Sequence, residues 1–334
     1  MKALVFEKGG IGDLRVVDLE RPSPGRGEVL VRVAMAGVNP IDYATATRLS
    51  AIATPKPHIP GSEFAGVVEA VGEGVEGLEP GDRVVVYNRV FDASCDMCLA
   101  GQEMLCRRGG LVGLHTNGGF AEYAVVPARN VFKIGEALSW ELAASLPIAA
   151  LTSYHALRRA GAGPGDLVVV VGAGGNTGMF AVQLAKIMGA TVVAISRKPW
   201  VKELGADYVA SLDKAREVVE EASGGRMADI VVDPLGSETL PTSLSLLGAN
   251  GRLVTFGVLT GQEVRVDFRA LYQAQHSIIG STGGTRRELL DLIGMAGRGL
   301  LKVRTWRTYP LEGSIEALEK LFAKERDGRI FIKP

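Results

Sequence analysis

The stretch from Asp166 to Lys198 constrains the fold of this chain more than any other. A run of apolar residues, Leu167–Val171, leads into glycines at positions 172, 174, 175 and 178. Apolar side chains then recur at helical spacing, and a second β-branched run follows. This order predicts strand, tight loop, helix and strand. Unpaired N–H groups at such a helix start favour negative charge, which indicates a dinucleotide site with its pyrophosphate there. The alternative is a glycine turn that serves only strand-to-helix packing.

The second strand of this stretch ends in Ser196, Arg197 and Lys198, which bears on the choice of cofactor. NAD sites place an acidic residue near this point to accept the ribose hydroxyls, whereas a 2′-phosphate requires cations and no carboxylate. We therefore expect NADP(H). The alternative is two solvated cations that merely follow a strand, although cations are unfavourable at a helix start.

Length and composition limit the class of protein. With 334 residues and 47% hydrophobic content, the chain is long enough for two domains. Its formal net charge is zero, so no overall field would hold nucleic acid or an anionic membrane. No apolar run reaches the roughly 18 residues of a membrane helix, and no signal-peptide pattern is present, so we expect a cytoplasmic protein. The low content of Asn, Gln and Cys favours a hot habitat.

The sequence pattern changes twice along the chain. Residues 1–145 alternate short β-branched runs with Gly, Pro and Asp turns, which predicts a barrel-like β domain. Residues 146–284 repeat strand and helix patterns, which predicts a doubly wound parallel sheet of the α/β class. Helical patterns return at 286–296 and 314–325. A final strand, Arg329–Lys333, is expected to rejoin the first domain.

Several local motifs together support a family resemblance over essentially the whole chain. They are Gly61-Ser62-Glu63-Phe64-Ala65-Gly66 with Gly72, Pro80–Val84, Gly119–Tyr123, Thr152–Leu157 and Gly280–Gly284. With them, the chain resembles the medium-chain dehydrogenase/reductase superfamily. The resemblance implies a Rossmann domain at 146–284, a β-rich GroES-like catalytic domain at 1–145 and 285–334, and a homo-oligomer, either a dimer or a tetramer.

The chain departs from the zinc enzymes of that superfamily at the catalytic metal. Their three zinc ligands correspond to Ala36, Ser62 and Ile148 here. Alanine and isoleucine offer no lone pair and a neutral hydroxyl is a poor ligand, so three protein ligands with an open position cannot form. Glu63 alone could not rescue the site. The run Ala36–Asp42 instead resembles the zinc-free quinone oxidoreductases.

A second metal site is predicted in a lobe at about residues 90–108. Zinc alcohol dehydrogenases carry four cysteines there, and the same spacing gives Asp92, Cys95, Cys98 and Cys106 in this chain. Three thiolates and a carboxylate make a closed tetrahedral set, so we expect one structural zinc ion per chain. The alternative is three incidental reduced thiols, because three cysteines do not make a disulfide framework.

The resemblance also implies which residues face the substrate and which contact the dinucleotide cofactor. At the reactive centre they are Asn39, Asp42, Tyr43 and Ser62. The alternative readings are a turn or helix cap for Asn39 and Asp42, a lining aromatic for Tyr43 and a small filler for Ser62. Cofactor contacts are implied at the loop, the strand ends and one C-terminal cation: Thr152, Gly172, Gly174, Gly175, Asn176, Thr177, Gly178, Ser196, Arg197, Lys198, Phe256, Gly257, Ser281, Thr282, Gly283 and Arg329.

These inferences predict an NADP(H)-dependent oxidoreductase that works without a catalytic metal. Hydrogen-bond donors suffice most easily when the hydride acceptor is already activated, as in a carbonyl, quinone or conjugated enone. An alcohol dehydrogenase or ketone reductase of narrow substrate range is the first alternative. A nucleotide-binding protein without turnover is the second.

Overall fold

The computed structural model describes residues 1–334, which form two compact units. The first unit comprises Met1–Ile148 and Gly284–Pro334, and the second comprises Ala149–Gly283. Each unit has its own sheet and its own apolar core. The sequence boundaries at 145/146 and 284/285 lie close to these divisions.

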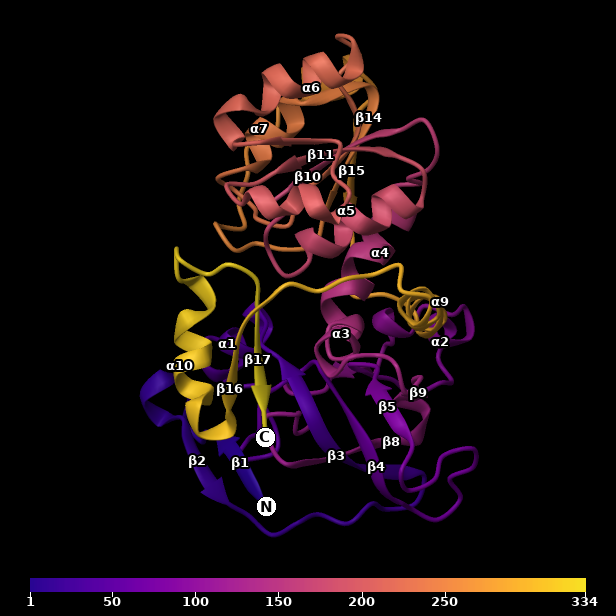
Figure 1. The fold of residues 1–334 in the computed structure, drawn as a ribbon, viewed down its shortest axis with the longest axis vertical. Coiled ribbons are helices and arrows are strands. Elements are labelled where there is room, and N and C mark those ends of the chain that lie inside the picture. Colours follow the sequence, from indigo (N-terminus) through magenta and orange to yellow (C-terminus); the bar gives the residue numbers. More distant parts are fainter. The chain divides into compact units, whose positions relative to one another are not determined.

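The second unit is built on a six-stranded parallel sheet, which confirms the predicted doubly wound α/β class (Figure 1). Its strands, in spatial order, are β12 (Tyr208–Ala210), β11 (Thr191–Ile195), β10 (Leu167–Val171), β13 (Ala228–Val232), β14 (Leu247–Thr255) and β15 (Ser277–Gly280). All five residues of β10 are buried. A strand that is apolar on both faces belongs in the middle of a sheet covered by helices.

Helices cover both faces of this sheet. Helices α4 (Leu151–Arg159) and α5 (Gly178–Ile187) pack against each other and against the sheet. Helices α6 (Ala215–Ser223) and α7 (Leu240–Ser245) contribute to the core on the other face (Figure 1). A short helix, α8 (Phe268–Gln273), precedes the edge strand β15. Because the strands are parallel, their carboxyl ends meet at one edge, where ligands of such sheets bind.

The first unit is built on a seven-stranded sheet that is mostly antiparallel. Its main path is β16 (Thr305–Pro310), β17 (Arg329–Lys333), β3 (Glu28–Gly37), β4 (Phe64–Val71), β5 (Arg83–Val86) and β9 (Val131–Lys133), and β8 (Tyr123–Pro127) also pairs with β3. Strand β17 pairs antiparallel with β3, so the final strand does rejoin the first unit as predicted. Strands β9 and β16 were not predicted.

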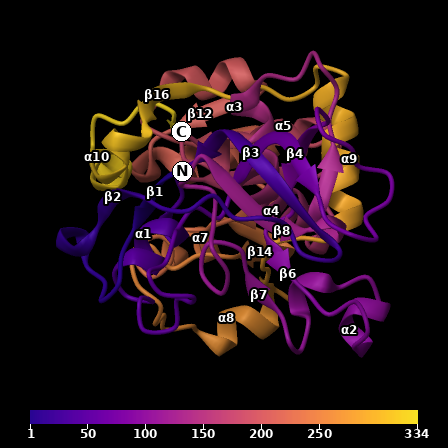
Figure 2. The ribbon, with the colours of Figure 1, turned by 90° about the horizontal axis from the view of Figure 1, so that it is seen from below.

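The register of three neighbouring strands positions the reactive centre. Ala36 of β3 pairs with Phe64 of β4, and Ala65 of β4 pairs with Val85 of β5. The end of β3, the start of β4 and the end of β5 therefore lie at the same end of the sheet. Figure 2 shows β3 and β4 side by side. The segments that leave this end of the sheet carry most of the residues predicted to act on the substrate.

Smaller elements complete the first unit. Strands β1 (Lys2–Val5) and β2 (Arg15–Asp18) form one ribbon, and β6 (Arg89–Val90) and β7 (Gly110–Leu111) form another. Three helices carry later points: α1 (Pro40–Ala46), α2 (Asp96–Leu99) and α9 (Arg286–Gly297). Helix α10 spans Ser314–Glu319 and is shorter than predicted, because a 3-10 turn follows it. No helix has the length and apolar content that crossing a bilayer requires.

Candidate active site and metal lobe

The glycine loop of the second unit has the geometry that the sequence predicted. Gly172 directly follows β10 and has a φ of 69°, in the left-handed region. A Cβ on Gly178 would lie 2.2 Å from the carbonyl oxygen of Gly172, so the first turn of α5 requires glycine there. Helix α5 begins directly after Asn176 and Thr177. The loop therefore presents a helix N-terminus, which favours an anion.

Several other predicted cofactor residues follow strands at the carboxyl edge of the same sheet. Ser196 follows β11, Phe256 follows β14 and Ser281 follows β15. Gly174 packs against this edge, because a Cβ there would lie 3.0 Å from Ser196 Oγ and 3.2 Å from Lys198 Cγ. The structure thus brings the loop and the ends of these strands together.

The cations after β11 differ in their surroundings. The backbone N–H of Lys198 donates to Ser196 Oγ at 3.0 Å, which fixes the turn. Lys198 is half-buried, whereas Arg197 is exposed and forms no ion pair. The edge therefore has a free guanidinium and no carboxylate at the end of β11.

Thr152 lies on helix α4, which packs against the sheet, and Thr282 and Gly283 follow strand β15. Thr152 is on α4, where Ser153 Oγ donates to the carbonyl oxygen of Thr177 at 2.8 Å and ties the helix to the loop. Gly257 approaches Pro234 so closely that a Cβ would lie 2.2 Å from its carbonyl oxygen. Thr282 is exposed, and Gly283 has a φ of 56°.

In the first unit, Asn39 and Asp42 cap helix α1. The backbone N–H of Asn39 donates to Asp42 Oδ2 at 2.8 Å, and the two side chains form a capping box. Asp42 Oδ1 accepts a second bond, from the backbone N–H of Ser62, at 2.8 Å. The structure therefore gives both residues the capping role that the sequence left open, and their action on a substrate stays a prediction.

Burial changes the proton affinity of Asp42. The carboxylate is fully buried, and desolvation raises its pKa from 3.8 to about 7, against the opposing effect of the two backbone hydrogen bonds. Ser62 is 1% exposed, and its Oγ has no hydrogen-bond partner. The hydroxyl lies close enough to Asp42 to lower the pKa of that carboxyl slightly, against the larger effect of burial. A titratable group and an unsatisfied hydroxyl thus lie next to each other.

Tyr43 is placed differently from its neighbours. Its ring meets Phe322 edge to face, with ring centroids 5.2 Å apart. The side chain is half-buried against the apolar core of the first unit. This contact agrees with the alternative of a packing aromatic, and its predicted donor role stays a prediction.

Glu63 accepts several hydrogen bonds in a buried polar network that the sequence did not predict. Its Oε1 accepts from the backbone N–H of Ile148 at 2.8 Å, and its Oε2 accepts from Asn39 Nδ2 at 2.7 Å. Arg329 Nη2 also donates to Oε2, and both ionic side chains are 0% exposed. Because each carboxylate oxygen is already engaged, Glu63 is not a spare metal ligand.

The same network includes Arg329, which the resemblance placed near the cofactor phosphates. Its guanidinium is buried in the first unit, where Nη2 donates to Glu63 and Asn39. Its Nε and Nη1 have no hydrogen-bond partner. The structure therefore gives Arg329 a role as the counter-ion of Glu63, and its contact with a phosphate stays a prediction.

The positions that would hold a catalytic zinc ion converge on this network. The backbone N–H of Gly37, next to Ala36, donates to the carbonyl oxygen of Glu63 at 2.8 Å, and Ser62 precedes Glu63. Ile148 donates to the Glu63 side chain. The three side chains are aliphatic or a lone hydroxyl, and such a donor set does not fit zinc.

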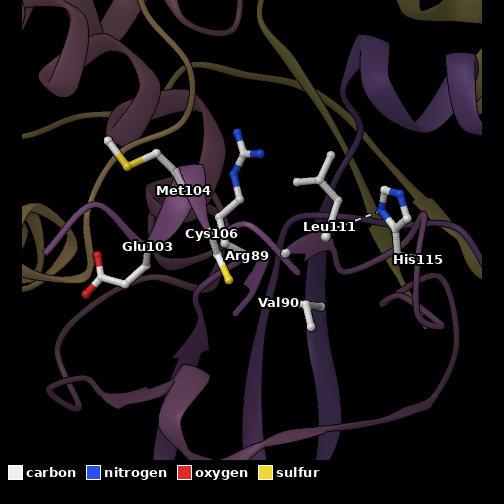
Figure 3. Close-up of a pocket in the computed structure, with 9 residues that line it drawn as sticks. Arg89, Val90, Glu103, Met104, Cys106, Leu111 and His115 are labelled. Atoms are coloured by element: carbon white, nitrogen blue, oxygen red, sulfur yellow. Dashed lines mark hydrogen bonds between the residues drawn. The ribbon is translucent and has the colours of Figure 1, made fainter. Parts of the chain in front are cut away.

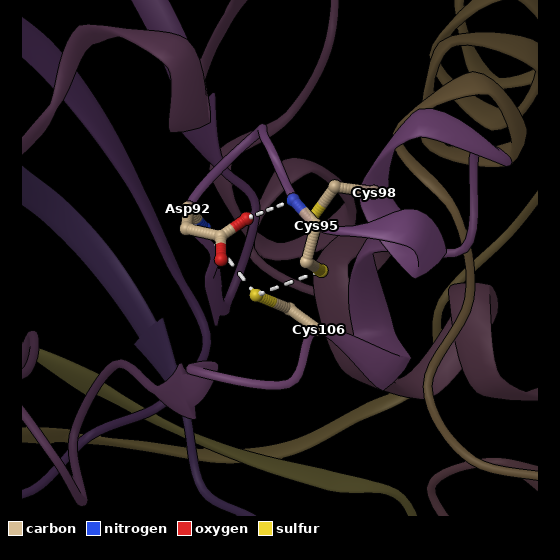
Figure 4. A group of neighbouring side chains, drawn as sticks. All are labelled: Asp92, Cys95, Cys98 and Cys106. Atoms are coloured by element: carbon tan, nitrogen blue, oxygen red, sulfur yellow. Dashed lines mark hydrogen bonds between the residues drawn. The ribbon is translucent and has the colours of Figure 1, made fainter.

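The lobe, in contrast, gathers a complete ligand set. The ligand atoms of Asp92, Cys95, Cys98 and Cys106 all lie within 4.8 Å of one another, and Figure 4 shows the side chains turned towards a common centre. Cys95 and Cys98 are held by α2, and Asp92 follows β6. Three sulfur atoms and one carboxylate fit a closed tetrahedral site.

Hydrogen bonds hold these ligands in place before any metal binds. Asp92 Oδ1 accepts from the backbone N–H groups of Ser94 and Cys95 at 2.8 and 2.9 Å, and its Oδ2 accepts from Arg108 at 2.9 Å. These bonds lower the pKa of Asp92, while desolvation raises the pKa of Cys98. Bound metal would displace the thiol proton. The lobe is preorganised around one carboxylate.

A pocket of about 210 Å³ lies beside the lobe (Figure 3). It is lined by Arg89, Val90, Glu103, Met104, Cys106, Gly109, Gly110, Leu111 and His115. Neither Ser62 nor any other residue predicted to act on the substrate contributes to it. The pocket therefore belongs to the lobe and not to the reactive centre.

Comparisons with known proteins agree with this geometry. Residues 25–136 match the alcohol dehydrogenase GroES-like domain, and residues 177–296 match the zinc-binding dehydrogenase family. The chain is 34% identical to an NAD-dependent alcohol dehydrogenase of Sulfolobus acidocaldarius, covering 100% of this chain and 99% of that protein. It is 30% identical to an acryloyl-coenzyme A reductase of Metallosphaera sedula, covering 99% of each.

A solved structure is similar over the same length. A cobalt- and zinc-bound thermostable alcohol dehydrogenase of Pyrobaculum aerophilum is 45% identical, with a TM-score of 0.94 over 100% of this chain and 99% of that chain. These findings confirm the resemblance, the GroES-like domain and the Rossmann domain that the sequence predicted. The chain therefore belongs to the medium-chain dehydrogenase/reductase superfamily, as a dehydrogenase or reductase.

Proposed function

We propose that this protein is an NADP(H)-dependent oxidoreductase that reduces a carbonyl, quinone or conjugated enone without a catalytic metal. One observation carries the proposal: the positions of a catalytic zinc ion hold Ala36, Ser62 and Ile148, while the glycine loop and the strand edge of a dinucleotide site are intact. The relatives named above are dehydrogenases and a reductase, which supports the same reaction class.

Without a Lewis acid, neutral donors must stabilise the substrate oxygen. A bound nicotinamide dinucleotide supplies or accepts the hydride. As negative charge develops on the oxygen, the buried Ser62 hydroxyl, which has no other partner, donates to it. Asp42 has a pKa of about 7 beside that hydroxyl and can hold the proton that the product requires.

The choice of NADP(H) rests on the end of β11. Arg197 is exposed and unpaired there, Ser196 stands in the place of an acidic ribose ligand, and Lys198 is adjacent. Two relatives are named as NAD-dependent, so the cofactor is a point on which this chain would differ from them.

The substitution Arg197→Ala tests this assignment. Losing a charge-assisted bond costs about 1.5–3 kcal/mol, so NADPH affinity should fall at least about tenfold while NADH affinity stays nearly unchanged. Arg159→Ala is the matched control, because this exposed arginine ends α4, on the side of the sheet where β10 begins. An equal loss for both cofactors would overturn the assignment.

The substrate class is open to a direct screen. NADPH consumption would be measured with aliphatic ketones, cyclic aryl ketones, quinones and enals. The names of the relatives favour alcohol oxidation and ketone reduction as the second candidate. Consumption with ketones alone would select that narrower function, whereas NADPH binding with no consumption by any compound would contradict an enzyme of this class.

We propose that the lobe binds one zinc ion per chain. Its four ligands are preorganised, and the closed set leaves no open position for chemistry.

We also propose a homo-oligomer. The edge strand β15 is unpaired on one side, and exposed apolar side chains, Phe268 and Tyr272 of α8 and Ile278 of β15, occur next to it in sequence. Sedimentation at several concentrations would test the assembly.

A further inference from the structure

Asn88 is a second buried polar residue without a side-chain hydrogen bond, after Ser62. The sequence did not predict a role for it. Asn88 is 4% exposed, and its carboxamide forms no hydrogen bond. A buried amide without a partner costs about 1–3 kcal/mol. Such a cost is common where a ligand or water completes the bonding.

The sheet register brings Asn88 towards Ser62. Strands β4 and β5 pair antiparallel, with Ala65 opposite Val85 and Gly66 opposite Val84. Strand β4 begins at Phe64 and β5 ends at Val86, so Ser62 and Asn88 each lie two residues beyond the paired strands, at the same end of the sheet.

The segment at residues 112–113 links the two positions independently. The backbone N–H of Val112 donates to the carbonyl oxygen of Asn88 at 2.9 Å. A Cβ on Gly113 would lie 2.8 Å from Ser62 Oγ. Asn88 and Ser62 therefore flank the same short segment, and the glycine keeps the space beside the hydroxyl free of a side chain.

Asn88 does not belong to the lobe pocket. The next two residues, Arg89 and Val90, line that pocket, whereas Asn88 does not (Figure 3). The unpartnered carboxamide therefore lies outside the lobe pocket, on the segment that adjoins Val112.

We propose that Asn88 is a substrate-positioning residue, whose carboxamide binds a hydroxyl group next to the reacting carbonyl. This inference rests on the proposed function. Ser62 supplies a donor to the carbonyl oxygen, and the fully buried Asn88 Oδ1 supplies an acceptor. The pair selects a substrate that has an acceptor and a donor on neighbouring carbons, such as an α-hydroxyketone, or a vicinal diol in the reverse direction.

The test compares two ketones that differ by one hydroxyl group, acetoin and 2-butanone, with NADPH as the reductant. A site built to hydrogen-bond a hydroxyl discriminates against the analogue that lacks it. The wild-type kcat/KM for acetoin should exceed that for 2-butanone at least about tenfold. Asn88→Leu keeps the side-chain size and should reduce this ratio at least fivefold, with NADPH affinity unchanged.

The melting temperature separates a role in substrate binding from a role in the fold. A structural role for Asn88 would make Asn88→Leu melt at a lower temperature. Asn88→Leu removes an unsatisfied polar group, so the melting temperature should stay the same or rise. Asn130→Leu is the matched control: this buried asparagine donates to Tyr87 and Arg89, and its replacement should lower the melting temperature without changing the substrate ratio.

Each outcome decides between the two proposals. A wild-type enzyme that reduces both ketones with equal kcat/KM would overturn the role of Asn88 and leave the proposed function standing, as would an unchanged ratio in Asn88→Leu. A lower melting temperature in Asn88→Leu with the ratio intact would assign Asn88 to the fold alone. Absence of turnover on any carbonyl would overturn the proposed function and this inference with it.

Discussion

The metal lobe and the reactive centre lie in the same unit, and each corresponds to a metal site of the zinc dehydrogenases. In the lobe, three sulfur atoms and a carboxylate lie within 4.8 Å of one another and are partly exposed. In the reactive centre, Glu63 is fully buried and its charge is met by Arg329 of the same chain. The lobe therefore holds the donor set of a metal site, with Arg108 paired to its carboxylate, whereas the reactive centre holds a buried ion pair and no such donor set.

This difference assigns different roles to the two regions. The lobe has a ligand set with no open position, so a metal bound there would contribute to folding and not to turnover. The reactive centre has unsatisfied donors and an Asp42 with a raised pKa, but no metal-ligand set. Four substitutions test this assignment.

Cys98→Ser should produce the largest loss of stability. A structural zinc ion contributes about 10–16 kcal/mol to the folding of a small site, so weakening it should lower the free energy of unfolding by several kcal/mol. The kcat of the folded fraction should stay unchanged. Leu99→Ser is the control, because this side chain is on the same helix and 77% exposed. A Cys98→Ser enzyme that is as stable as the wild type would contradict a stabilising metal in the lobe.

Glu63→Gln should be the next most damaging. Breaking a buried ion pair leaves an uncompensated charge and costs about 3–5 kcal/mol. Glu312→Gln removes an exposed partner of Lys2, whose attraction water screens, so its effect on stability should be far smaller. Denaturant unfolding would measure both. If the two variants lose similar stability, the reactive centre is not held by its buried pair.

Asp42→Asn should change the pH dependence of stability. Because the pKa of Asp42 is about 7 in the folded protein and near 3.8 when unfolded, the native state binds an extra proton between these values. The contribution of Asp42 to stability is therefore full below about pH 4 and is lost as the pH rises to about 7. The wild type should lose up to about 1.4 kcal/mol per pH unit relative to Asp42→Asn in this range. Parallel stability profiles for the two proteins would show that Asp42 ionises normally.

Asp92→Cys should have the smallest effect. It gives the lobe four cysteines, which also form closed zinc sites, so one metal should still bind and stability should change little. Asp92→Ala provides the contrast and should weaken metal binding. Equal metal affinity in Asp92→Ala and the wild type would show that the carboxylate is not a ligand.

Local patterns explain which parts could be predicted from the sequence. The glycine loop and β10 are encoded within a short stretch, and the four lobe residues lie within 15 positions of one another, from Asp92 to Cys106. The spacing of Asn39 and Asp42 fits a capping box and a catalytic pair equally well, so only coordinates separate the two readings.

Long-range contacts explain what could not be predicted. Arg329 meets Glu63 across 266 residues, through the pairing of β17 with β3, and no local pattern announces that contact. Asn88 lies near Ser62 through the pairing of β4 with β5 and through the segment at residues 112–113, which are contacts between distant parts of the sequence. Strand β16 is at the edge of the sheet, contains the charged Arg307 and lacks the apolar alternation that marks strands.

We propose that the one metal ion of this protein supports folding and takes no part in turnover. Treatment with a chelator, with zinc content, NADPH-dependent activity and unfolding followed in the same sample, separates the two roles. We expect one zinc ion per chain and activity that persists until the structure unfolds. Two zinc ions per chain, or activity lost before any unfolding, would contradict it.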